Sequence, residues 1–384
     1  MEPVYLDNAA TTKVDKEVLK AMAPYFDEFY GNASSMHVKG QEAKKAVEKA
    51  RETIARAINA KLEEIYFTSG GTESNNWALK GAFFENFPKK NHIVTVKTEH
   101  DCILNTAKWL EGKGAKVTYL DVDKEGFINI EKLKKAITPK TFLVSVMQAN
   151  NEIGTIQNLE EIGNICRERK ILFHTDAAQS FTKIPLDVKR MNLNLVTINA
   201  HKVYGPKGVG ALFIREGVKI TPLLHGGGHE RGQRSGTENV PGIIGFGKAV
   251  EISGKTDYKK MSALRDKLIK WIIEKIPDSK LNGPVGDKRL PNNVNITFKG
   301  CEGEALGGYL ENKNIYVSTG SACMSNTNAQ SHVLAAIGLS REEQESSIRF
   351  TLGKETTEKN IDYVMKVLSE IIEKMRTAGK IKNG

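Results

Sequence analysis

The feature that most constrains the fold is a regular alternation of short apolar runs and amphipathic stretches between residues 38 and 214. The apolar runs resemble buried strands in length and composition, whereas the stretches between them carry apolar residues at helical spacing. Strands and helices that alternate in this way form a mainly parallel sheet covered by helices on both faces. Strands are predicted at residues 65–68, 92–99, 116–120, 142–147, 171–173, 195–198 and 209–214, the last of which can run antiparallel. Helices are predicted at residues 38–58, 130–137, 159–169 and from an N-cap at Thr72 towards residue 84.

Two of these strands are followed by charged side chains. Lys202 comes shortly after the run 195–198, and Asp176 follows the run 171–173. Open α/β sheets place their ligands beyond the carboxyl ends of the strands, where a lysine loses hydration, its pKa falls and its amine becomes available for a Schiff base. The chain has 56 Lys and Arg residues, so a single lysine is more often a surface residue. A carboxylate on the neighbouring strand reverses that expectation, because an aldehyde cofactor on the lysine needs an anion opposite its pyridine nitrogen.

The chain is long enough for two domains. It has 384 residues, with 40% hydrophobic and 27% charged residues, as is typical of a soluble globular enzyme. A Ser-Gly-Lys-Thr break at residues 253–256 marks the predicted boundary between a large cofactor-binding domain, 16–255, and a smaller α+β domain, 1–15 with 256–384. The smaller domain is expected to contain strands at residues 293–298, 315–317 and 347–352, a helix at 304–310, long helices before residue 276 and near the C-terminus, and the loop that carries Cys323.

Charge and hydropathy limit the classes of partner. The net charge is +10, but lysines and glutamates are interspersed except in the basic tail 374–382, so a solvated surface is favoured over nucleic-acid binding. No run approaches the length of a membrane span, and the N-terminus does not resemble a secretion signal. We therefore expect a cytoplasmic protein that requires neither a membrane nor direct contact with nucleic acid.

The four cysteines lack the spacing of a disulfide framework or a zinc site. The functional role that remains for a cysteine is that of a single reactive thiol. Cys323 lies in a loop rich in Gly, Ser and Asn, which suits a mobile nucleophile. Cys301 precedes a possible helix start, whose dipole would lower the pKa of the thiol. From the residues alone the two candidates are nearly even.

Several segments together resemble one family. They are Ser69–Asn76 (SGGTESNN), Thr98–His100 (TEH), the segments around Asp176 and Lys202, and Gly226–Asn239 (GGGHERGQRSGTEN). In these segments the chain is similar to the NifS/IscS-type cysteine desulfurases, which are fold-type I pyridoxal-phosphate enzymes of the class V aminotransferase family. The similarity runs from Leu6 to the final helix. It implies an aspartate aminotransferase-like fold and pyridoxal 5′-phosphate as the cofactor.

The resemblance also assigns roles to individual residues. Lys202 would hold the cofactor, Asp176 would face its ring nitrogen, and His100 would stack on the ring and move protons. A glycine-rich turn before a helix suits a phosphate, and Arg349 matches the arginine that binds the substrate carboxylate. The cofactor-binding residues implied are Gly71, Thr72, His100, Asn150, Asp176, Gln179, Asn199, His201, Lys202 and Thr237, and the substrate-binding residues are Arg349, Asn150 and Asn32. Thr237 would reach the phosphate of a neighbouring subunit, which implies a homodimer with a shared active site.

The implied reaction converts L-cysteine to L-alanine. The resemblance selects Cys323, in the motif Gly-Ser-Ala-Cys, as the thiol that takes up the sulfur as a persulfide. The sulfur would then pass to an iron–sulfur scaffold, to a tRNA-modifying protein or to a small reductant. Rival interpretations are a selenocysteine lyase or another enzyme of the same family, which would not need Cys323, and an interaction protein that retains the cofactor without turnover.

The chain departs from the family pattern at three places. Ala33 stands where proline is usual, so the turn before the first long helix is less restricted. Asn199 stands where relatives commonly carry a serine that binds phosphate, although its amide can still donate a hydrogen bond. Residues 324–329, after the cysteine, also differ from those of the housekeeping members.

Overall fold

The computed structural model describes residues 3–319 and 330–382, without the side chains of residues 378–382. Its largest sheet has seven strands, ordered β2-β8-β7-β6-β5-β3-β4. The strands are β2 (Ile65–Thr68), β3 (His92–Val96), β4 (Lys116–Leu120), β5 (Thr141–Ser145), β6 (Leu172–Asp176), β7 (Leu195–Asn199) and β8 (Gly210–Ile214). Adjacent strands are parallel, except that β8 is antiparallel to both β7 and β2. The predicted mainly parallel sheet is confirmed, and the strand left open in direction is antiparallel.

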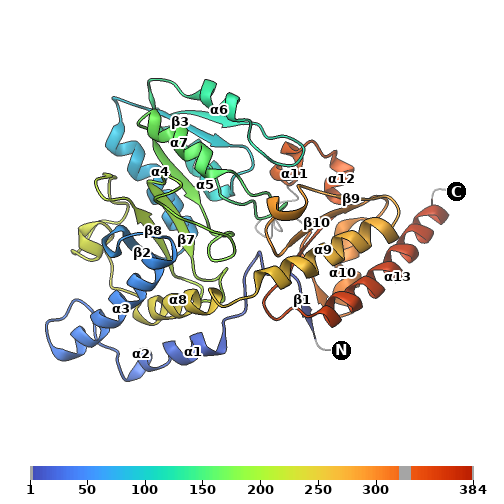
Figure 1. Cartoon of the computed structure of the whole chain (residues 1–384), viewed down its shortest axis with the longest axis horizontal. Helices are drawn as coiled ribbons and strands as arrows, with labels where there is room; N and C mark the ends of the chain where they lie inside the picture. Colours follow the sequence, from blue (N-terminus) through green and yellow to red (C-terminus); the bar gives the residue numbers. More distant parts are fainter. Residues whose placement is uncertain (1–2, 320–329, 383–384) are drawn as a thin grey trace.

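Helices cover both faces of this sheet (Figure 1). Successive residues of a strand point to opposite faces, so Ile93 and Leu195 pack in one buried cluster and Val94 and Val196 in another. The first cluster is closed by α4 (Gly71–Asn86) and α5 (Asp101–Glu111). The second is closed by α3 (Val38–Ala57), α7 (Leu159–Glu168) and α8 (Val240–Ser253). The central strands β3 and β7 are buried along their whole length, because helices keep water from both faces of the sheet.

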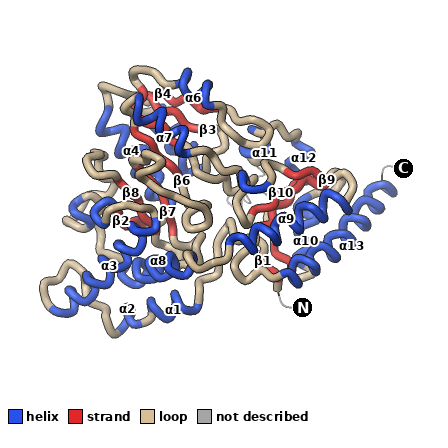
Figure 2. Tube along the Cα trace, viewed as in Figure 1, coloured by secondary structure: helices blue, strands red, loops and turns tan. Residues whose placement is uncertain are grey.

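A separate hydrophobic cluster forms the part of the molecule at the right of Figures 1 and 2. It is built from α9 (Tyr258–Lys275), β9 (Ser279–Leu281), β10 (Asn293–Phe298), α10 (Gly303–Glu311), β12 (Ser347–Thr351) and α13 (Glu358–Lys382). The start of the chain joins it, because β1 (Val4–Tyr5) pairs in parallel with β11 (Ile315–Tyr316), and Val4 and Leu6 are buried in the cluster. This packing supports the predicted boundaries at residues 15 and 255, which themselves stay a prediction.

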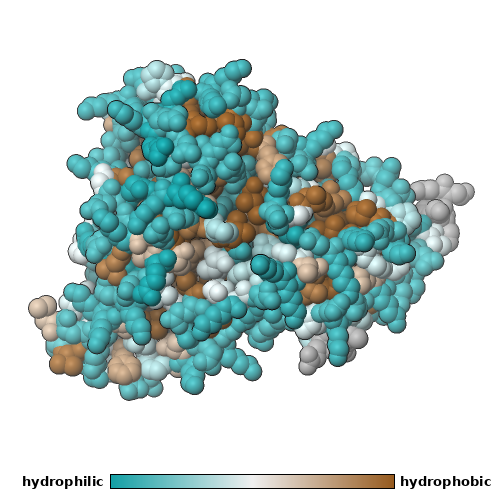
Figure 3. Space-filling model, in the orientation of Figure 1, coloured by the Kyte–Doolittle hydropathy of each residue, from teal (hydrophilic) through white to brown (hydrophobic). Residues whose placement is uncertain are grey.

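The remaining elements are short. The helices are α1 (Lys16–Met22), α2 (Pro24–Asp27), α6 (Ile130–Ala136), α11 (His332–Ala336) and α12 (Arg341–Glu345), and the 3₁₀ turns are η1 (Leu62–Glu64), η2 (Glu230–Gly232) and η3 (Gly286–Lys288). The face shown in Figure 3 is mostly hydrophilic, with hydrophobic residues gathered in a few patches. Within the described ranges, no helix combines the length and the apolar character needed to cross a bilayer.

One predicted helix boundary is wrong. The sequence predicts Thr72 as the cap of α4, but the cap residue is Gly70 and the helix begins at Gly71. Gly70 has a φ of 153°, which a residue with a side chain rarely adopts. The backbone of Gly70 also lies close to Gly210, where an added Cβ would come within 2.8 Å of the Gly70 Cα. The two glycines let the strand β8 and the start of α4 approach each other directly.

Candidate active site

Lys202 lies three residues beyond the end of β7, with its side chain under the N-terminal segment of the chain. Its Nζ donates hydrogen bonds to the carbonyl oxygen of Ala10, at 2.6 Å, and to that of Ala9. The Ala9 carbonyl also accepts from Nε2 of Gln179 at 2.9 Å. Two of the predicted cofactor residues, Lys202 and Gln179, are therefore brought together through one backbone carbonyl.

Asp176 is the last residue of β6, the strand that pairs in parallel with β7. Its carboxylate is buried, and its two oxygens accept hydrogen bonds from the backbone N–H of Ala178 at 2.8 Å and from Nδ2 of Asn75 at 2.6 Å. The expectation that the strands before Asp176 and Lys202 are neighbours is confirmed. A buried carboxylate at this edge of the sheet suits a cationic ring nitrogen, because an opposite charge would compensate for its burial.

His100 caps the N-terminus of α5. Its Nδ1 accepts from the backbone N–H of Cys102 at 3.2 Å and lies 3.1 Å from the Cys102 Sγ. The same sulfur is 3.0 Å from Nδ2 of Asn75, which also donates to Asp176. The predicted ring-stacking histidine is thus connected to the predicted ring-nitrogen carboxylate through Asn75 and Cys102, to which the sequence assigns no role.

The N-terminus of α4 has the properties of an anion site. Gly70 has no side chain to cap the first N–H groups of the helix, so these groups and the helix dipole face outward. Asn199 is buried beside this end, because a Cβ on Gly71 would lie 3.3 Å from its Nδ2. Its Oδ1 has no hydrogen-bond partner among the described residues. With Thr72 exposed at the second helical position, this cradle fits a phosphate group.

His201 directly precedes Lys202 in the chain. Its Nδ1 lies 3.2 Å from the hydroxyl of Thr11. Burial, and then the positive charges of Lys202, Lys207 and Lys183, lower the pKa of His201 to about 4. The ring is therefore neutral at pH 7 and contributes hydrogen bonding and packing next to Lys202 rather than a positive charge.

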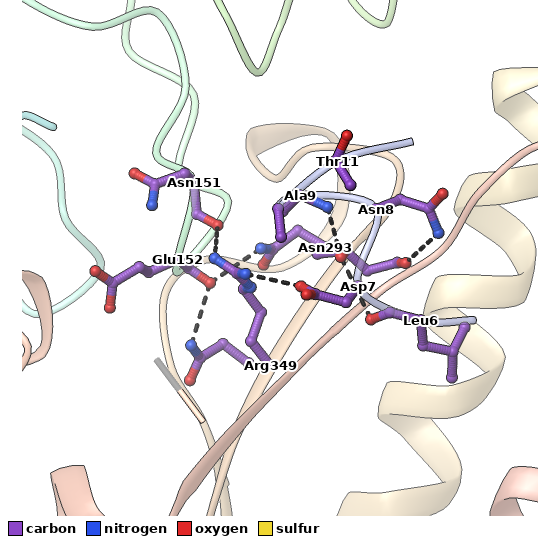
Figure 4. A network of polar contacts seen from close by, with 12 residues as sticks. Leu6, Asp7, Asn8, Ala9, Thr11, Asn151, Glu152, Asn293 and Arg349 are labelled. Atoms are coloured by element: carbon purple, nitrogen blue, oxygen red, sulfur yellow. Dashed lines mark hydrogen bonds and ion pairs between the residues drawn. The ribbon is translucent and has the colours of Figure 1, made fainter. Parts of the chain in front are cut away.

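Arg349, on β12, points towards the loop after β5 and the N-terminal segment (Figure 4). One terminal nitrogen donates to the Asn151 carbonyl at 3.1 Å and the other to Oδ1 of Asp7 at 3.0 Å. The arginine side chain is 2% exposed, and its Nε has no hydrogen-bond partner among the described residues. A buried guanidinium held by only one carboxylate retains donors for a second anion, as the predicted contact with a substrate carboxylate requires.

Asn150 is occupied by contacts that shape the loop after β5. Its Nδ2 donates to the Thr98 carbonyl at 2.9 Å, and its Oδ1 accepts from the backbone N–H groups of Glu152 and Ile153 at 2.8 and 2.9 Å. Its Nδ2 also lies 3.5 Å from the Met147 Sδ, and a thioether is only a weak acceptor, so a contact to the cofactor could replace this one. The predicted contacts of Asn150 with cofactor and substrate stay predictions.

Two predicted site residues lie on the surface of the chain. Asn32 is exposed, and its Oδ1 accepts from the backbone N–H of Ser34 at 2.8 Å. Thr237 is exposed and lines a cavity of about 160 Å³ together with Ser69 and Arg234. Among the contacts of the described residues, neither reaches Lys202 or Arg349, so their assigned roles stay predictions.

The two candidate thiols have different outcomes. Cys323 lies outside the described residues, so its role as the nucleophile stays a prediction. Cys301 is buried, and burial raises the pKa of its thiol despite the opposing charge of Arg376. The helix α10 begins only at Gly303, with Glu302 as its cap. The expectation that a helix dipole activates Cys301 is therefore wrong, because the residue lies before the helix and inside the core.

Sequence reasoning missed four residues that the structure brings to the site: Asp7, Asn75, Glu99 and Cys102. Asn75 and Glu99 lie inside the segments SGGTESNN and TEH, which carry the resemblance, and Asp7 follows Leu6, where the similarity begins. Cys102 is two positions after His100, where a helix N-terminus returns its N–H to the capping side chain. The capping position of His100 is therefore the sequence signal from which its contact with Cys102 could be predicted.

Comparison with known proteins agrees with this geometry. The family model for class-V aminotransferases matches residues 4–364. A cysteine desulfurase IscS from Clostridium botulinum (strain Hall) is 52% identical over 377 residues, which cover 97% of this chain and 95% of that protein. A solved NifS-like protein superposes with a TM-score of 0.91 at 41% identity, over 97% of this chain and 99% of the other. A structure of SspA in complex with cysteine gives a TM-score of 0.83 at 40% identity, over 92% and 100%. The chain therefore belongs to the class-V aminotransferase family and, within it, to the cysteine desulfurases of the IscS and NifS type.

Proposed function

We propose that this protein uses pyridoxal 5′-phosphate to convert L-cysteine to L-alanine and keeps the sulfur as a persulfide on Cys323. The observation that carries the proposal is the convergence of a lysine and a buried carboxylate at the ends of two adjacent parallel strands. Lys202 follows β7, Asp176 ends β6, and the uncapped start of α4 lies at the same edge of the sheet. These are the three groups that such a cofactor needs: an amine, an anion for its ring nitrogen, and donors for its phosphate.

When bound, pyridoxal 5′-phosphate supplies an electron sink that stabilises negative charge on the substrate carbon atoms. Lys202 would hold it covalently, Asp176 would keep a proton on its ring nitrogen, and the N–H groups of Gly71 and Thr72 would bind its phosphate. Gln179 has an Nε2 already held by the Ala9 carbonyl, so its amide is fixed in orientation. Because the pKa of His201 is lowered, its ring is neutral and adds no positive charge near the amine of Lys202.

Arg349 orients the substrate. The guanidinium is fixed by Asp7 and the Asn151 carbonyl, so it loses little freedom when a carboxylate binds. Its burial strengthens the contact, because water does not compete for the donors. A substrate α-carboxylate bound there has its position set relative to Lys202 by the segment from Asp7 to Ala10, which contacts both side chains.

The sulfur transfer balances without an external oxidant. The Cys323 thiolate attacks the substrate sulfur, the carbon–sulfur bond breaks, and a sulfur–sulfur bond forms. The electron pair of the broken bond stays on the carbon, which takes up a proton and becomes the methyl group of alanine. The carbon is reduced because it keeps both electrons of the carbon–sulfur bond, and the sulfur is oxidised because it gives up its share of them. A sulfur-acceptor protein, such as an iron–sulfur scaffold, would then remove the outer sulfur atom.

The experiment compares wild type, Lys202→Ala and Cys323→Ala with L-cysteine and L-selenocysteine as substrates. We expect wild type to release one alanine for each sulfur atom transferred over many turnovers and Lys202→Ala to be inactive. Cys323→Ala should lose activity on L-cysteine. If Cys323→Ala desulfurates L-cysteine at the wild-type rate, the persulfide mechanism is wrong. If wild type releases alanine only from L-selenocysteine, the protein is a selenocysteine lyase.

We further propose that the working form is a cytoplasmic homodimer. Large hydrophobic side chains are exposed on one segment around α2, with Phe26 67%, Tyr30 69%, Met36 90% and Val38 73% exposed. Exposed apolar groups concentrated in this way mark interaction surfaces. Asn32 lies in the same segment, and Thr237 is also exposed. If a second copy bound there, these two residues would contact the active site of that copy, as their assigned roles require. Transfer of sulfur to a scaffold protein is part of the same proposal.

A further inference from the structure

A hydrogen-bonded bridge connects Asp176 to His100 through two residues that have no assigned role. Nδ2 of Asn75 is 2.6 Å from Oδ2 of Asp176 and 3.0 Å from Sγ of Cys102. The same sulfur is 3.1 Å from Nδ1 of His100. The bridge joins the end of β6, the second turn of α4 and the start of α5. It therefore couples the two groups that would lie against the ring of the cofactor.

The orientation of Asn75 is determined by its neighbours. An ionised carboxylate only accepts hydrogen bonds, so the nitrogen of the Asn75 amide must face Asp176. The residue is completely buried, so water does not replace these contacts. Its Oδ1 has no partner among the described residues. One amide hydrogen serves Asp176 and the other points at the Cys102 sulfur. With the sulfur accepting from Asn75, the thiol hydrogen is left to donate to His100.

The tautomer of His100 follows from the same contacts. Its Nδ1 accepts from the backbone N–H of Cys102 at 3.2 Å because His100 is the cap of α5. In a neutral imidazole one nitrogen accepts and the other carries the proton. Both contacts, from the backbone N–H and from the thiol, require Nδ1 to be the acceptor. The proton of the neutral ring is thus held on Nε2.

We propose that Asn75 and Cys102 are positioning residues that hold His100 in the Nε2–H tautomer and fix its ring relative to Asp176. The inference rests on the proposed function, in which His100 and Asp176 both serve the cofactor. Its consequence is that His100 presents a proton donor, and not an acceptor, to the reacting groups. Without the thiol, one of the two contacts that require Nδ1 to accept is lost and the longer one, from the backbone N–H, remains, so the other tautomer becomes more accessible.

The test is nitrogen NMR of the cofactor-free protein with labelled histidine, compared between wild type, Cys102→Ala and Cys102→Ser. We expect wild type to show Nδ1 as an acceptor and Nε2 protonated. Cys102→Ala should show a mixture of tautomers at His100. Cys102→Ser should restore the wild-type pattern, because a hydroxyl donates in the same position. A purely structural role of Cys102 would not predict rescue of the tautomer.

The second arm uses the two adjacent asparagines of α4. Asn75→Ala removes the bridge, whereas Asn76→Ala removes only a contact to the Thr72 carbonyl and serves as the matched control. With the loaded enzyme, we expect Cys102→Ala to lower kcat about 10-fold, as a misplaced proton donor does, with KM within about 2-fold. A wild-type protein with Nδ1 protonated, or a Cys102→Ala spectrum identical to wild type, overturns the proposal. Should Asn75→Ala fail to fold, the Cys102 pair decides alone. Because the NMR arm needs no turnover, its result is independent of whether the proposed function holds.

Discussion

At the scale of single residues, Arg349 sets how the substrate would bind. Its guanidinium contacts Asp7 and the Asn151 carbonyl from two different nitrogens, which a lysine ammonium cannot reproduce in one position. We expect Arg349→Lys to raise the KM for L-cysteine about 10- to 100-fold, because a hydrogen bond to a charged group contributes about 1.5–3 kcal/mol. Steady-state kinetics measure this. Arg341→Lys, at an exposed arginine paired with Glu345, is the control and should leave KM unchanged.

Glu99 is a carboxyl group buried next to the site. Its Oε1 accepts from the backbone N–H of Met147 at 2.5 Å, and its Oε2 has no partner among the described residues. Burial, and then the negative charge of Asp176, raise the pKa of Glu99 well above its usual value. The folded protein therefore keeps a proton on Glu99 at a pH where the unfolded chain has lost it.

This protonation has a consequence for stability. The unfolded carboxyl ionises near pH 4.3, roughly, so above that pH the native state binds more protons and each rise in pH favours unfolding. Glutamine does not titrate, keeps the acceptor for Met147 and resembles the protonated acid. We expect Glu99→Gln to be more stable than wild type at pH 8, and its advantage to shrink as the pH falls to 5. Thermal denaturation at several pH values measures this, and a difference in Tm that is constant across pH would contradict it.

At the scale of elements, one buried and one partly exposed ion pair hold the segment that carries Thr237. Glu230 makes two contacts with Arg51 of α3, at 2.7 and 2.8 Å, and accepts from the backbone N–H of Phe67 on β2. The side chains of Arg51 and Glu230 are 3% and 4% exposed. Nearby, Arg234 pairs with Glu73 in the first turn of α4 at 2.8 and 3.0 Å. The segment is thereby fixed against the start of the predicted phosphate site.

Removing one partner of the buried pair tests this attachment. We expect Glu230→Ala to lower the free energy of unfolding by about 1–3 kcal/mol, because the Arg51 guanidinium loses its buried partner and keeps only Glu48, whose side chain is 38% exposed. Glu52→Ala is the matched control, since Glu52 and Arg56 form an exposed pair one turn apart on α3, worth about 0.5 kcal/mol or less. Urea denaturation gives both values. Equal losses in the two variants would show that the Glu230 contact does not stabilise the fold.

The elements show what a sequence can predict. Mainly apolar runs such as 195–198 identify central strands, and so the neighbouring placement of Asp176 and Lys202 could be predicted from strand order alone. The cap of α4 was misplaced because a side chain that can cap, Thr72, competes in the sequence with the backbone freedom of Gly70. The contact of Asp7 with Arg349 joins positions 342 residues apart. No local pattern encodes that contact, because it depends on how β1 packs into the cluster of β12.

At the scale of the whole molecule, the exposed hydrophobic segment around α2 makes the oligomeric state testable. We expect a mass by light scattering of twice the 42.5 kDa chain. Met36→Lys should weaken the dimer, because a charge would be buried at the interface. Val285→Lys is the control, as Val285 is 66% exposed in a different part of the chain. A monomer that retains full activity would contradict both the dimer and the shared active site.

The central claim, that Lys202 and Asp176 direct sulfur from L-cysteine onto the chain, is tested most directly by mass spectrometry of peptides after brief exposure to L-cysteine. The account predicts one additional sulfur atom on the peptide that contains Cys323. It predicts none on the peptide of Cys301, whose thiol is buried with a raised pKa. In Lys202→Ala the Cys323 peptide should stay unmodified. An unmodified Cys323 peptide in wild type that is turning over, or a modified one in Lys202→Ala, would contradict the account.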